Sequence, residues 1–510
     1  MIRRLVSCGL LALLLFACLF RLDSVPPVWW DEGWTLSVAR NWVERGFYGR
    51  LLKGEPAPAG LEAAVTVTAP IALSFQVLGV GVWQGRLVGL VFLLGALVSK
   101  YFLAKCLYSQ RVATFTMAAL LIMGVLAEWH PVVMARQVLG EVPMLFYLLT
   151  GYLLFYLALS RCLLLMLVAI LLWAIAIITK AQALPFWMAS LMLPLVLTIY
   201  CRRWRLTAVI ATGLLSSIAT AKLLLWLHDQ MLTALPRSEV TGLYEVTALV
   251  FDFDSRKRAV LVLLFILPTV FGIYYETRKV VISSLWKRLK TSEETVRLML
   301  LSLVISWLAW YVLLSNSALR YIFPVIFVGS VFLGKFLGDL TDHKVKSNGD
   351  LSLNLASVYK RIFSRRFAAK LFIATSSVAT LTMLYSFYFA PPDQSFTKVI
   401  DFLNTRTPPK ALIESYESEI LFLTDRPYHY PPDQVHVDLI RRSFSSAEYA
   451  QIAYNPLAAD PDYLVVGPQA KRWNLYGPVL QTGAFRMVAS SKLYNIYERV
   501  RNRGTGGSTR

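Results

Sequence analysis

Long runs of apolar residues alternate with short polar segments along most of this chain. A helical run of about 17–25 apolar residues matches the thickness of a membrane hydrocarbon core. Such runs predict about eleven transmembrane helices, near residues 5–21, 84–105, 111–128, 143–160, 163–180, 184–200, 207–227, 259–275, 298–314, 321–338 and 368–390. Pro70–Val80 is a shorter apolar segment, with the length of a re-entrant or half-spanning helix. The pattern predicts an α-helical polytopic membrane protein.

The pattern changes after the last apolar run, where "APPDQ" opens a polar region. Strand-like pieces occur at Lys410–Tyr416, Asp462–Gly467 and Lys492–Val500, and "FTKVIDFLNT" has the spacing of a helix. We therefore expect a membrane domain over residues 1–390 and a small α/β domain over residues 391–500. The Gly- and Ser-rich tail at 501–510 is predicted to be disordered.

Composition and charge agree with this division and orient it. Of the 510 residues, 56% are hydrophobic and only 16% are charged, and the net charge is +20. The basic residues gather in loops between apolar runs, which is typical of the cytoplasmic side of a membrane protein and weighs against a nucleic-acid partner. These loops are Cys201–Arg205, Glu276–Arg297 and Gly338–Lys370. The N-terminus is then cytoplasmic and, with an odd number of spans, the C-terminal domain lies outside the plasma (inner) membrane.

Ionisable residues recur at the outer ends of the predicted spans. The first outer loop, residues 22–69, carries the adjacent acids Asp31 and Glu32 in "VWWDEGWTLSVARNW". Ionisable groups at membrane depth are costly and are commonly functional. In this arrangement, bases could hold the phosphate of a lipid, and a carboxylate could accept a proton from an attacking hydroxyl. The other residues at this face are Arg86, Arg136, Glu141, Lys180 and Arg320.

Each of these residues also has a structural explanation. Asp31 and Glu32 would be stabilised by the dipole at the start of a surface helix. Glu141 could pair with Arg136, five residues earlier in the chain. Lysine and arginine at span ends can also extend toward the membrane surface without any ligand. Arg86 at the start of a span is more often structural than functional. An aromatic belt at the membrane interface would account for Trp29, Trp30, Trp34 and Trp42.

Five short motifs over residues 1–340 resemble one known group of membrane enzymes. In chain order they are "WWDEGWTLSVARNW", "VTVTAPIALSFQVLGVGVWQGRLVG", "ARQVLGEVPMLFY", "ITKAQALPF" and "LRYIFPVIF". Together they resemble the GT-C membrane glycosyltransferases, in the family that contains the protein O-mannosyltransferases and the bacterial aminoarabinose transferase of lipid A. Where many members have "HPP", this chain has "TAP" at Thr68–Pro70, which leaves the acceptor open.

The resemblance implies an integral-membrane enzyme that transfers a sugar from a polyprenyl-phosphate donor to an acceptor hydroxyl, with inversion. It implies that Asp31 is the base, and that Glu32 and Glu141 support it or bind acceptor or sugar. It also implies that basic and phenolic side chains hold the donor phosphate: Lys180, Arg320, Arg136 and Tyr321.

Several points stay open from the sequence. The sequence requires no cofactor, although a divalent metal ion could bind beside the carboxylates. The acceptor could be a lipid, a glycan or a protein. A transporter or flippase for a lipid-linked sugar would share the basic groove, but it would need no carboxylate pair. Transporters also tend to contain internal repeats, and none is found here.

Overall fold

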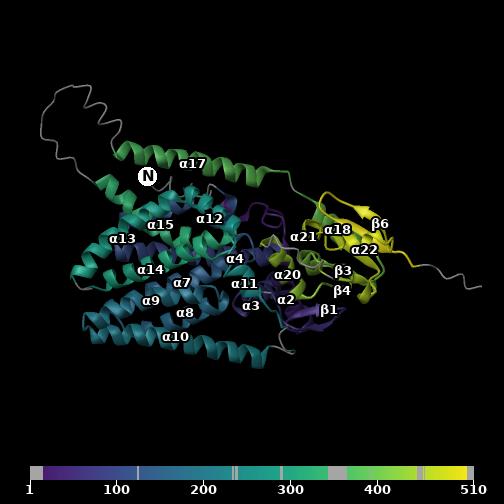
Figure 1. Cartoon of the computed structure of the whole chain (residues 1–510), viewed down its shortest axis with the longest axis horizontal. Coiled ribbons are helices and arrows are strands. Elements are labelled where there is room, and N and C mark those ends of the chain that lie inside the picture. Colours follow the sequence, from purple (N-terminus) through teal and green to yellow (C-terminus); the bar gives the residue numbers. More distant parts are fainter. Residues whose placement is uncertain are drawn as a thin grey trace, which may run out of the picture.

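A computed structural model shows a long helical bundle with a sheet-containing domain at one end (Figure 1). The structure describes residues 15–501 except 62, 123–125, 233–234, 236–238, 288–290, 343–364, 392, 445–451 and 453. Most of the predicted first span, most of the loop Gly338–Lys370 and nearly all of the tail 501–510 therefore lie outside the described residues. We call the end of the bundle beside the C-terminal domain the domain end, and the opposite end the far end.

Apolar helices build the bundle. They are α4 (Val82–Leu107), α5 (Gln110–Ile122), α7 (Glu141–Ser160), α8 (Leu165–Thr179), α9 (Ala183–Tyr200), α10 (Trp204–Met231), α12 (Phe253–Phe265), α13 (Leu267–Lys287), α14 (Ser292–Leu313), α15 (Leu319–Asp342) and α17 (Arg365–Phe389). Among the described residues, seven helices are long and apolar enough to cross a membrane, or eight if α12 and α13 count as one bent span. The predicted spans 84–105 through 368–390 fall on these helices, but α5 ends at Ile122, before the predicted residue 128, and α5 and α8 are too short to be among the seven. The segment 259–275 lies across an 80° bend between α12 and α13.

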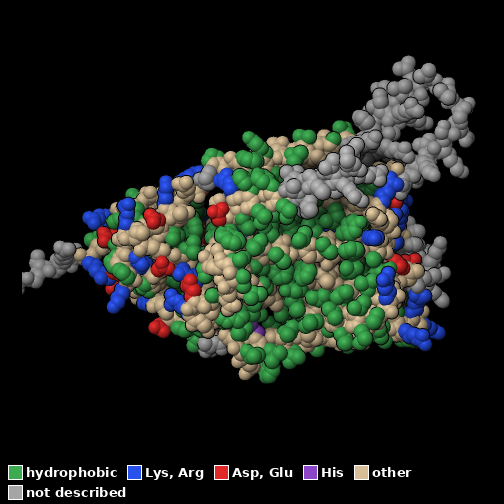
Figure 2. Space-filling model, turned by 180° about the vertical axis from the view of Figure 1, so that it is seen from behind, with side chains coloured by type: hydrophobic (Ala, Val, Ile, Leu, Met, Phe, Trp, Pro, Cys, Tyr) green, Lys and Arg blue, Asp and Glu red, His purple; other side chains and the backbone are tan. Residues whose placement is uncertain are grey.

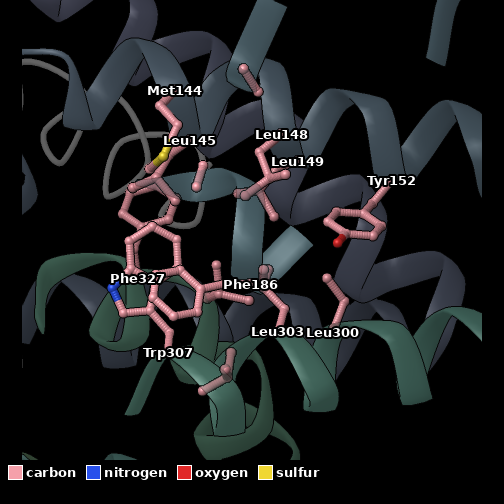
Figure 3. Packing of buried hydrophobic residues seen from close by; sticks show 14 of the residues in the cluster. Met144, Leu145, Leu148, Leu149, Tyr152, Phe186, Leu300, Leu303, Trp307 and Phe327 are labelled. Atoms are coloured by element: carbon pink, nitrogen blue, oxygen red, sulfur yellow. The ribbon is translucent and has the colours of Figure 1, made fainter. Parts of the chain in front are cut away.

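The centre of the bundle is packed with large apolar side chains (Figure 3). Leu145 and Leu148 of α7 are fully buried, and they belong to the same core as Phe186 of α9, Trp307 of α14 and Phe327 of α15. The rings of Phe186 and Trp307 lie 4.4 Å apart between centroids. Because α7, α9, α14 and α15 share one core, the residues at their domain ends are held in a fixed arrangement.

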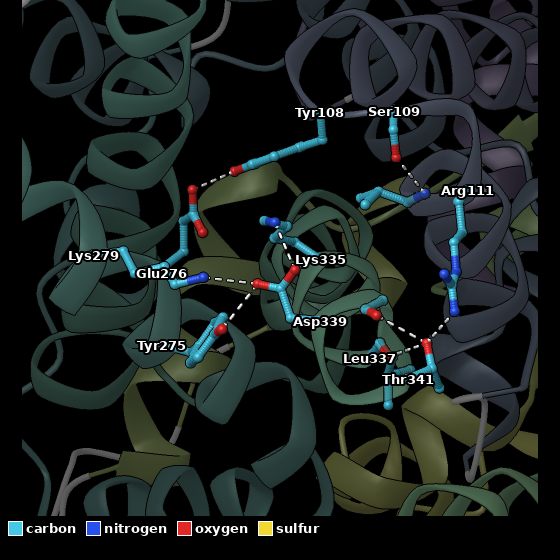
Figure 4. A network of polar contacts seen from close by, with 12 residues as sticks. Tyr108, Ser109, Arg111, Tyr275, Glu276, Lys279, Lys335, Leu337, Asp339 and Thr341 are labelled. Carbon is cyan, nitrogen blue, oxygen red and sulfur yellow. Dashed lines mark hydrogen bonds and ion pairs between the residues drawn. The ribbon is translucent and has the colours of Figure 1, made fainter. Parts of the chain in front are cut away.

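Polar side chains join three helices at the far end (Figure 4). Asp339 of α15 accepts hydrogen bonds from Lys279 and Tyr275 of α13, at 2.7 and 2.8 Å, and from Lys335 of its own helix at 2.7 Å. Arg111 of α5 donates to Thr341 at 2.9 Å. These contacts fix α5, α13 and α15 against one another, away from the domain end.

The outer surface has a broad apolar band between two charged ends (Figure 2). Large side chains such as Leu94, Leu164 and Leu261 are more than half exposed on it. A surface of this extent is typical of contact with lipid. Lysine and arginine occupy the turns at the far end, where α4, α7 and α9 finish: Lys105, Arg111, Arg161, Arg202 and Arg203.

Short elements connect the bundle to the C-terminal domain. They are α2 (Trp30–Arg45), β1 (Arg50–Leu52), β2 (Glu55–Ala57), α3 (Val65–Leu78), α6 (Pro131–Ala135) and α11 (Leu243–Thr247). The predicted half-span Pro70–Val80 falls mainly within α3. Helix α2 lies between the bundle and the domain (Figure 1), and it packs against α19 (Ser418–Leu423) of the domain.

The C-terminal domain contains a five-stranded mixed sheet in the order β4-β3-β5-β7-β6. Its strands are β3 (Ile413–Ser415), β4 (Tyr428–His429), β5 (Tyr463–Val466), β6 (Phe485–Ser490) and β7 (Asn495–Arg499). Helices α18 (Ser395–Arg406), α20 (Asp433–Phe444), α21 (Pro468–Trp473) and α22 (Gly477–Gln481) complete it. The three predicted strand segments contain β3, β5 and β7, and the predicted helix is α18. β4 and β6 were not predicted. The domain boundaries at 390 and 500 stay a prediction.

Candidate active site

Two acids and two bases form a cluster at the domain end, which we call the charged cluster. Arg320 at the start of α15 is paired with Asp31 in the first turn of α2. Lys180, which follows the last residue of α8, is paired with Glu141, the first residue of α7. The Arg320 Nε atom also lies 3.9 Å from Glu141 Oε1. Four elements far apart in the chain thus bring Asp31, Glu141, Lys180 and Arg320 together.

Helix ends explain part of this arrangement. A carboxylate is favoured at a helix N-terminus and an ammonium at a C-terminus, so Asp31, Glu141 and Lys180 each have the favourable sign. Arg320 has the unfavourable sign, because it lies in the first turn of α15. The carboxylates of Asp31 and Glu141 offset this cost. Arg320 is thus the residue of the cluster that its own helix does not favour, which suggests a role beyond stabilising α15.

Aromatic rings border the two bases. The Lys180 Nζ atom lies 5.7 Å from the centre of the Tyr321 ring, and the Arg320 Cζ atom lies 5.4 Å from it. The centre of the Trp29 ring, immediately before α2, lies 5.5 Å from the Arg320 Cζ atom. Cations beside aromatic faces are stabilised electrostatically. Tyr321 therefore lies beside both Lys180 and Arg320, and its role at a donor phosphate stays a prediction.

The cluster is partly open, and it has hydrogen-bonding capacity left. The side chains of Asp31, Arg320 and Lys180 are 26%, 29% and 21% exposed, whereas that of Glu141 is 2% exposed. Arginine has five N–H donors in a fixed fork, so one contact to Asp31 leaves several for a ligand. The buried Oε2 atom of Glu141 has no hydrogen-bond partner among the described residues. The cluster can therefore bind another polar group without first being taken apart.

Glu32 lies beside this cluster in sequence but is held elsewhere. Both of its carboxylate oxygens accept hydrogen bonds from Arg86, at 2.7 and 2.8 Å, and both side chains are fully buried. Arg86 also donates to the carbonyl oxygens of Leu22 and Pro26, at 3.0 and 2.8 Å. This geometry matches the structural explanation for Arg86. It positions the chain on either side of Asp31 and leaves Glu32 no exposed oxygen.

Arg136 is also placed away from the charged cluster. Its guanidinium is buried and donates to five carbonyl oxygens between Ala17 and Val25, at 2.7 to 3.0 Å. Most of these carbonyls belong to the end of the first helix, where backbone acceptors lack helical partners. With these donors engaged, Arg136 has little capacity left for a phosphate. The pairing of Glu141 with Arg136 that the sequence allowed is wrong, because Glu141 pairs with Lys180.

The C-terminal domain contributes residues that the sequence did not single out. The His436 ring of α20 stacks on Trp30 with centroids 4.2 Å apart and planes 7° apart. The Tyr416 hydroxyl lies 2.5 Å from His436 Nδ1. Trp30 Nε1 donates to the Tyr416 carbonyl oxygen at 2.7 Å. Trp30 precedes Asp31, so these contacts bring the domain beside the charged cluster.

An apolar groove of about 460 Å³ opens next to Lys180. Its walls come from the loop before α3, the end of α8, the start of α9 and the last turns of α10. Thr179 and Ala181, the two neighbours of Lys180, line it, together with His228. A hydrocarbon chain could lie here with a polar group near Lys180.

The described residues contain no group of three or more histidine, cysteine or acidic side chains that could hold a metal ion. Each acid of the charged cluster faces a cation instead. A divalent ion beside these carboxylates therefore stays an expectation from the sequence.

The fold is similar to that of several solved membrane proteins. ArnT from Cupriavidus metallidurans bound to undecaprenyl phosphate superposes with a TM-score of 0.64, at 16% identity, over 98% of each chain. This decides the fold. The chain has the GT-C architecture. It is a multi-pass membrane protein with a mixed-sheet C-terminal domain, as the sequence predicted.

Two further structures support the same fold. ArnT in the apo state gives a TM-score of 0.63 at 15% identity, over 98% of this chain and 99% of that one. The archaeal oligosaccharyltransferase AglB from Archaeoglobus fulgidus, in complex with an inhibitory peptide and a dolichol-phosphate, gives 0.54 at 11% identity. That match covers 97% of this chain and 74% of AglB. No protein-family model and no curated protein sequence matches the chain.

Proposed function

We propose that this protein is a glycosyltransferase that uses a polyprenyl-phosphate sugar as donor. The observation that carries the proposal is the charged cluster, in which Lys180 and Arg320 lie beside Asp31 at the domain end of a GT-C fold. Support comes from the similarity to ArnT bound to undecaprenyl phosphate. The apolar groove beside Lys180 is suited to the hydrocarbon part of such a donor.

Three residues of the cluster, Asp31, Lys180 and Arg320, then each have one role. Lys180 and Arg320 hold the donor phosphate, with Tyr321 bordering both. The oxygen of the acceptor hydroxyl forms a bond to C1 of the sugar, and Asp31 accepts the proton of that hydroxyl. The C1–O bond to the phosphate breaks, and its electron pair stays on the leaving polyprenyl phosphate, whose charge the two bases stabilise. Attack opposite to the leaving phosphate inverts C1.

The site faces the extracytoplasmic side in this proposal, and the C-terminal domain covers it there. Basic residues at the far end, such as Arg202 and Arg203, support this orientation.

The test is Asp31→Asn, which keeps the shape of the side chain but cannot accept the proton. Labelled undecaprenyl-phosphate pentose and hexose are incubated with the purified variant and a membrane extract as acceptor pool. Turnover should fall about 100-fold or more, because a side-chain base contributes roughly that much. Binding of undecaprenyl phosphate should persist. Asp254→Asn, at a carboxylate that is 77% exposed and forms a surface pair with Lys257, is the matched control.

Near-normal turnover of Asp31→Asn would remove Asp31 as the base. Wild-type protein in liposomes that moves intact donor across the bilayer, with no transfer, would favour the flippase instead.

A further inference from the structure

The part of the site that faces the C-terminal domain contains a second polar pair, Tyr416 and His436. Helix α20, which carries His436, is fixed to the first loop by a buried ion pair. In that pair Arg50 donates to the two oxygens of Asp433 at 2.9 and 2.7 Å. The Ser418 hydroxyl also donates to the Trp30 carbonyl oxygen. His436 is therefore held in place from both sides of the junction between loop and domain.

The hydrogen bond between Tyr416 and His436 determines which ring nitrogen carries the proton. The Tyr416 hydroxyl has no other hydrogen-bond partner in the described part of the chain, and an imidazole nitrogen is a better acceptor than a phenol oxygen. Burial raises the pKa of Tyr416, so the hydroxyl keeps its proton and donates a hydrogen bond to Nδ1. Burial also lowers the pKa of His436. The negative charges of Asp31 and Asp433 raise this pKa, but the positive charge of Arg320 lowers it, and the net shift is downward. The ring is neutral, with its proton on Nε2.

The Nε2–H group is available to a ligand. It donates no hydrogen bond to any described residue, and the side chain is only partly buried. Asp31 and Arg320 both act electrostatically on His436, so the ring lies near the charged cluster. A hydroxyl oxygen between Asp31 and His436 could donate its proton to the carboxylate and accept a hydrogen bond from Nε2. Its remaining lone pair would be free to attack.

We propose that His436 binds the acceptor hydroxyl through Nε2–H, and that Tyr416 positions His436 by holding its imidazole in the Nε2–H tautomer. This rests on the glycosyltransferase function proposed above. The acceptor site is then shared between the first loop, which supplies Asp31, and the C-terminal domain, which supplies His436. Lys180 and Arg320 serve the donor, whereas His436 serves the acceptor.

The first experiment separates the acceptor from the donor. His436→Phe keeps an aromatic ring on Trp30 but loses the N–H donor. One neutral hydrogen bond is worth about 0.5–1.5 kcal/mol, so the KM for the acceptor extract should rise about threefold to tenfold. Affinity for undecaprenyl phosphate should not change. His436→Gln, which retains an N–H donor, should recover part of the loss. Lys492→Ala in the same domain, at a side chain that is 82% exposed, is the control.

The second experiment reads the tautomer without any substrate. The chain has five histidines, so 15N-histidine labelling gives few signals. The signals that disappear in His436→Gln are those of His436. Wild-type protein should show His436 protonated on Nε2, and Tyr416→Phe should give a mixture of tautomers. A wild-type Nδ1–H tautomer would overturn the inference, as would an unchanged acceptor KM in His436→Phe. A wild-type protein that binds no donor and transfers no sugar would contradict the proposed function itself, and the role of His436 with it.

Discussion

At the scale of single residues, the sequence singled out all four members of the charged cluster, but it also included Glu32, Arg86 and Arg136, which lie elsewhere, and it did not predict the pairing. Asp31, Glu141, Lys180 and Arg320 stand out in the sequence because a charge beside an apolar run is costly. Their partners depend on how α2, α7, α8 and α15 pack, and Asp31 and Arg320 are 289 positions apart. The different partners of the adjacent residues Asp31 and Glu32 also depend on how the helices pack. Adjacent residues on a helix point in different directions, and only Glu32 faces Arg86.

The role proposed for Lys180, binding of the donor phosphate, predicts that its replacement weakens donor binding. Lys180→Ala removes one charge-assisted contact to the phosphate and leaves Glu141 with Arg320 3.9 Å away. Such a contact contributes about 1.5–3 kcal/mol, so affinity for undecaprenyl phosphate should fall about tenfold to a hundredfold. Titration of the purified protein measures this. Lys492→Ala, at a side chain that is 82% exposed, is the control. Equal affinities in the two variants would show that Lys180 does not bind the donor and only extends toward the membrane surface.

The Glu32–Arg86 pair predicts a defect in stability. Glu32→Gln leaves the buried Arg86 guanidinium without its counter-charge, and breaking one side of a buried pair costs about 3–5 kcal/mol. The thermal unfolding midpoint in detergent should fall clearly. The double change Glu32→Leu with Arg86→Met removes both charges and should restore part of the loss. If Glu32→Gln keeps the wild-type midpoint but loses turnover, Glu32 acts in catalysis instead.

At the scale of elements, the contact of α2 with α19 joins the bundle to the C-terminal domain. A Cβ atom at Gly33 would lie 2.2 Å from the Glu419 backbone nitrogen, so only glycine allows this approach. Two buried acids of the domain lie at the same contact. Glu417 accepts a hydrogen bond from the Ala470 N–H at 2.8 Å, and Glu419 accepts one from the Tyr494 hydroxyl at 2.9 Å. The sequence shows these acids but not their burial, because the fold brings them under α2.

This buried pair predicts a pH dependence. Burial raises the pKa of Glu419 to about 7 and that of Glu417 well above its usual range. Groups with raised folded-state pKa values bind more protons when folded, so their contribution is complete in acid and is lost as the pH rises toward and past neutrality. The thermal midpoint should therefore fall between about pH 5 and pH 8. Glu417→Gln should flatten this slope and raise the midpoint at the higher pH. Glu498→Gln, 41% exposed, should leave the slope unchanged. An identical slope in Glu417→Gln would show that another group titrates.

At the scale of the whole molecule, apolar runs predicted the bundle well, because backbone groups in lipid must be satisfied within a helix. The bend between α12 and α13 was missed, since apolar length carries no information about direction. β4 has two residues and β6 is largely exposed, so neither has the pattern of a buried strand. The contribution of His436 was missed for a similar reason. It lies outside the apolar runs, and only the docking of the C-terminal domain stacks it on Trp30, next to Asp31 in the chain.

The orientation of the molecule is tested by labelling at its two ends. The basic residues at the far end predict that this end is cytoplasmic and that the C-terminal domain lies outside. Lys492 is 82% exposed on the domain, and Gln110 is exposed at the turn between α4 and α5. In a variant with all five native cysteines replaced, Lys492→Cys should react with an impermeant thiol reagent when only the outer barrier is open. Gln110→Cys should react only after the inner membrane is lysed. The reverse pattern would place the charged cluster on the cytoplasmic side, where the proposed site could not act on an extracytoplasmic acceptor.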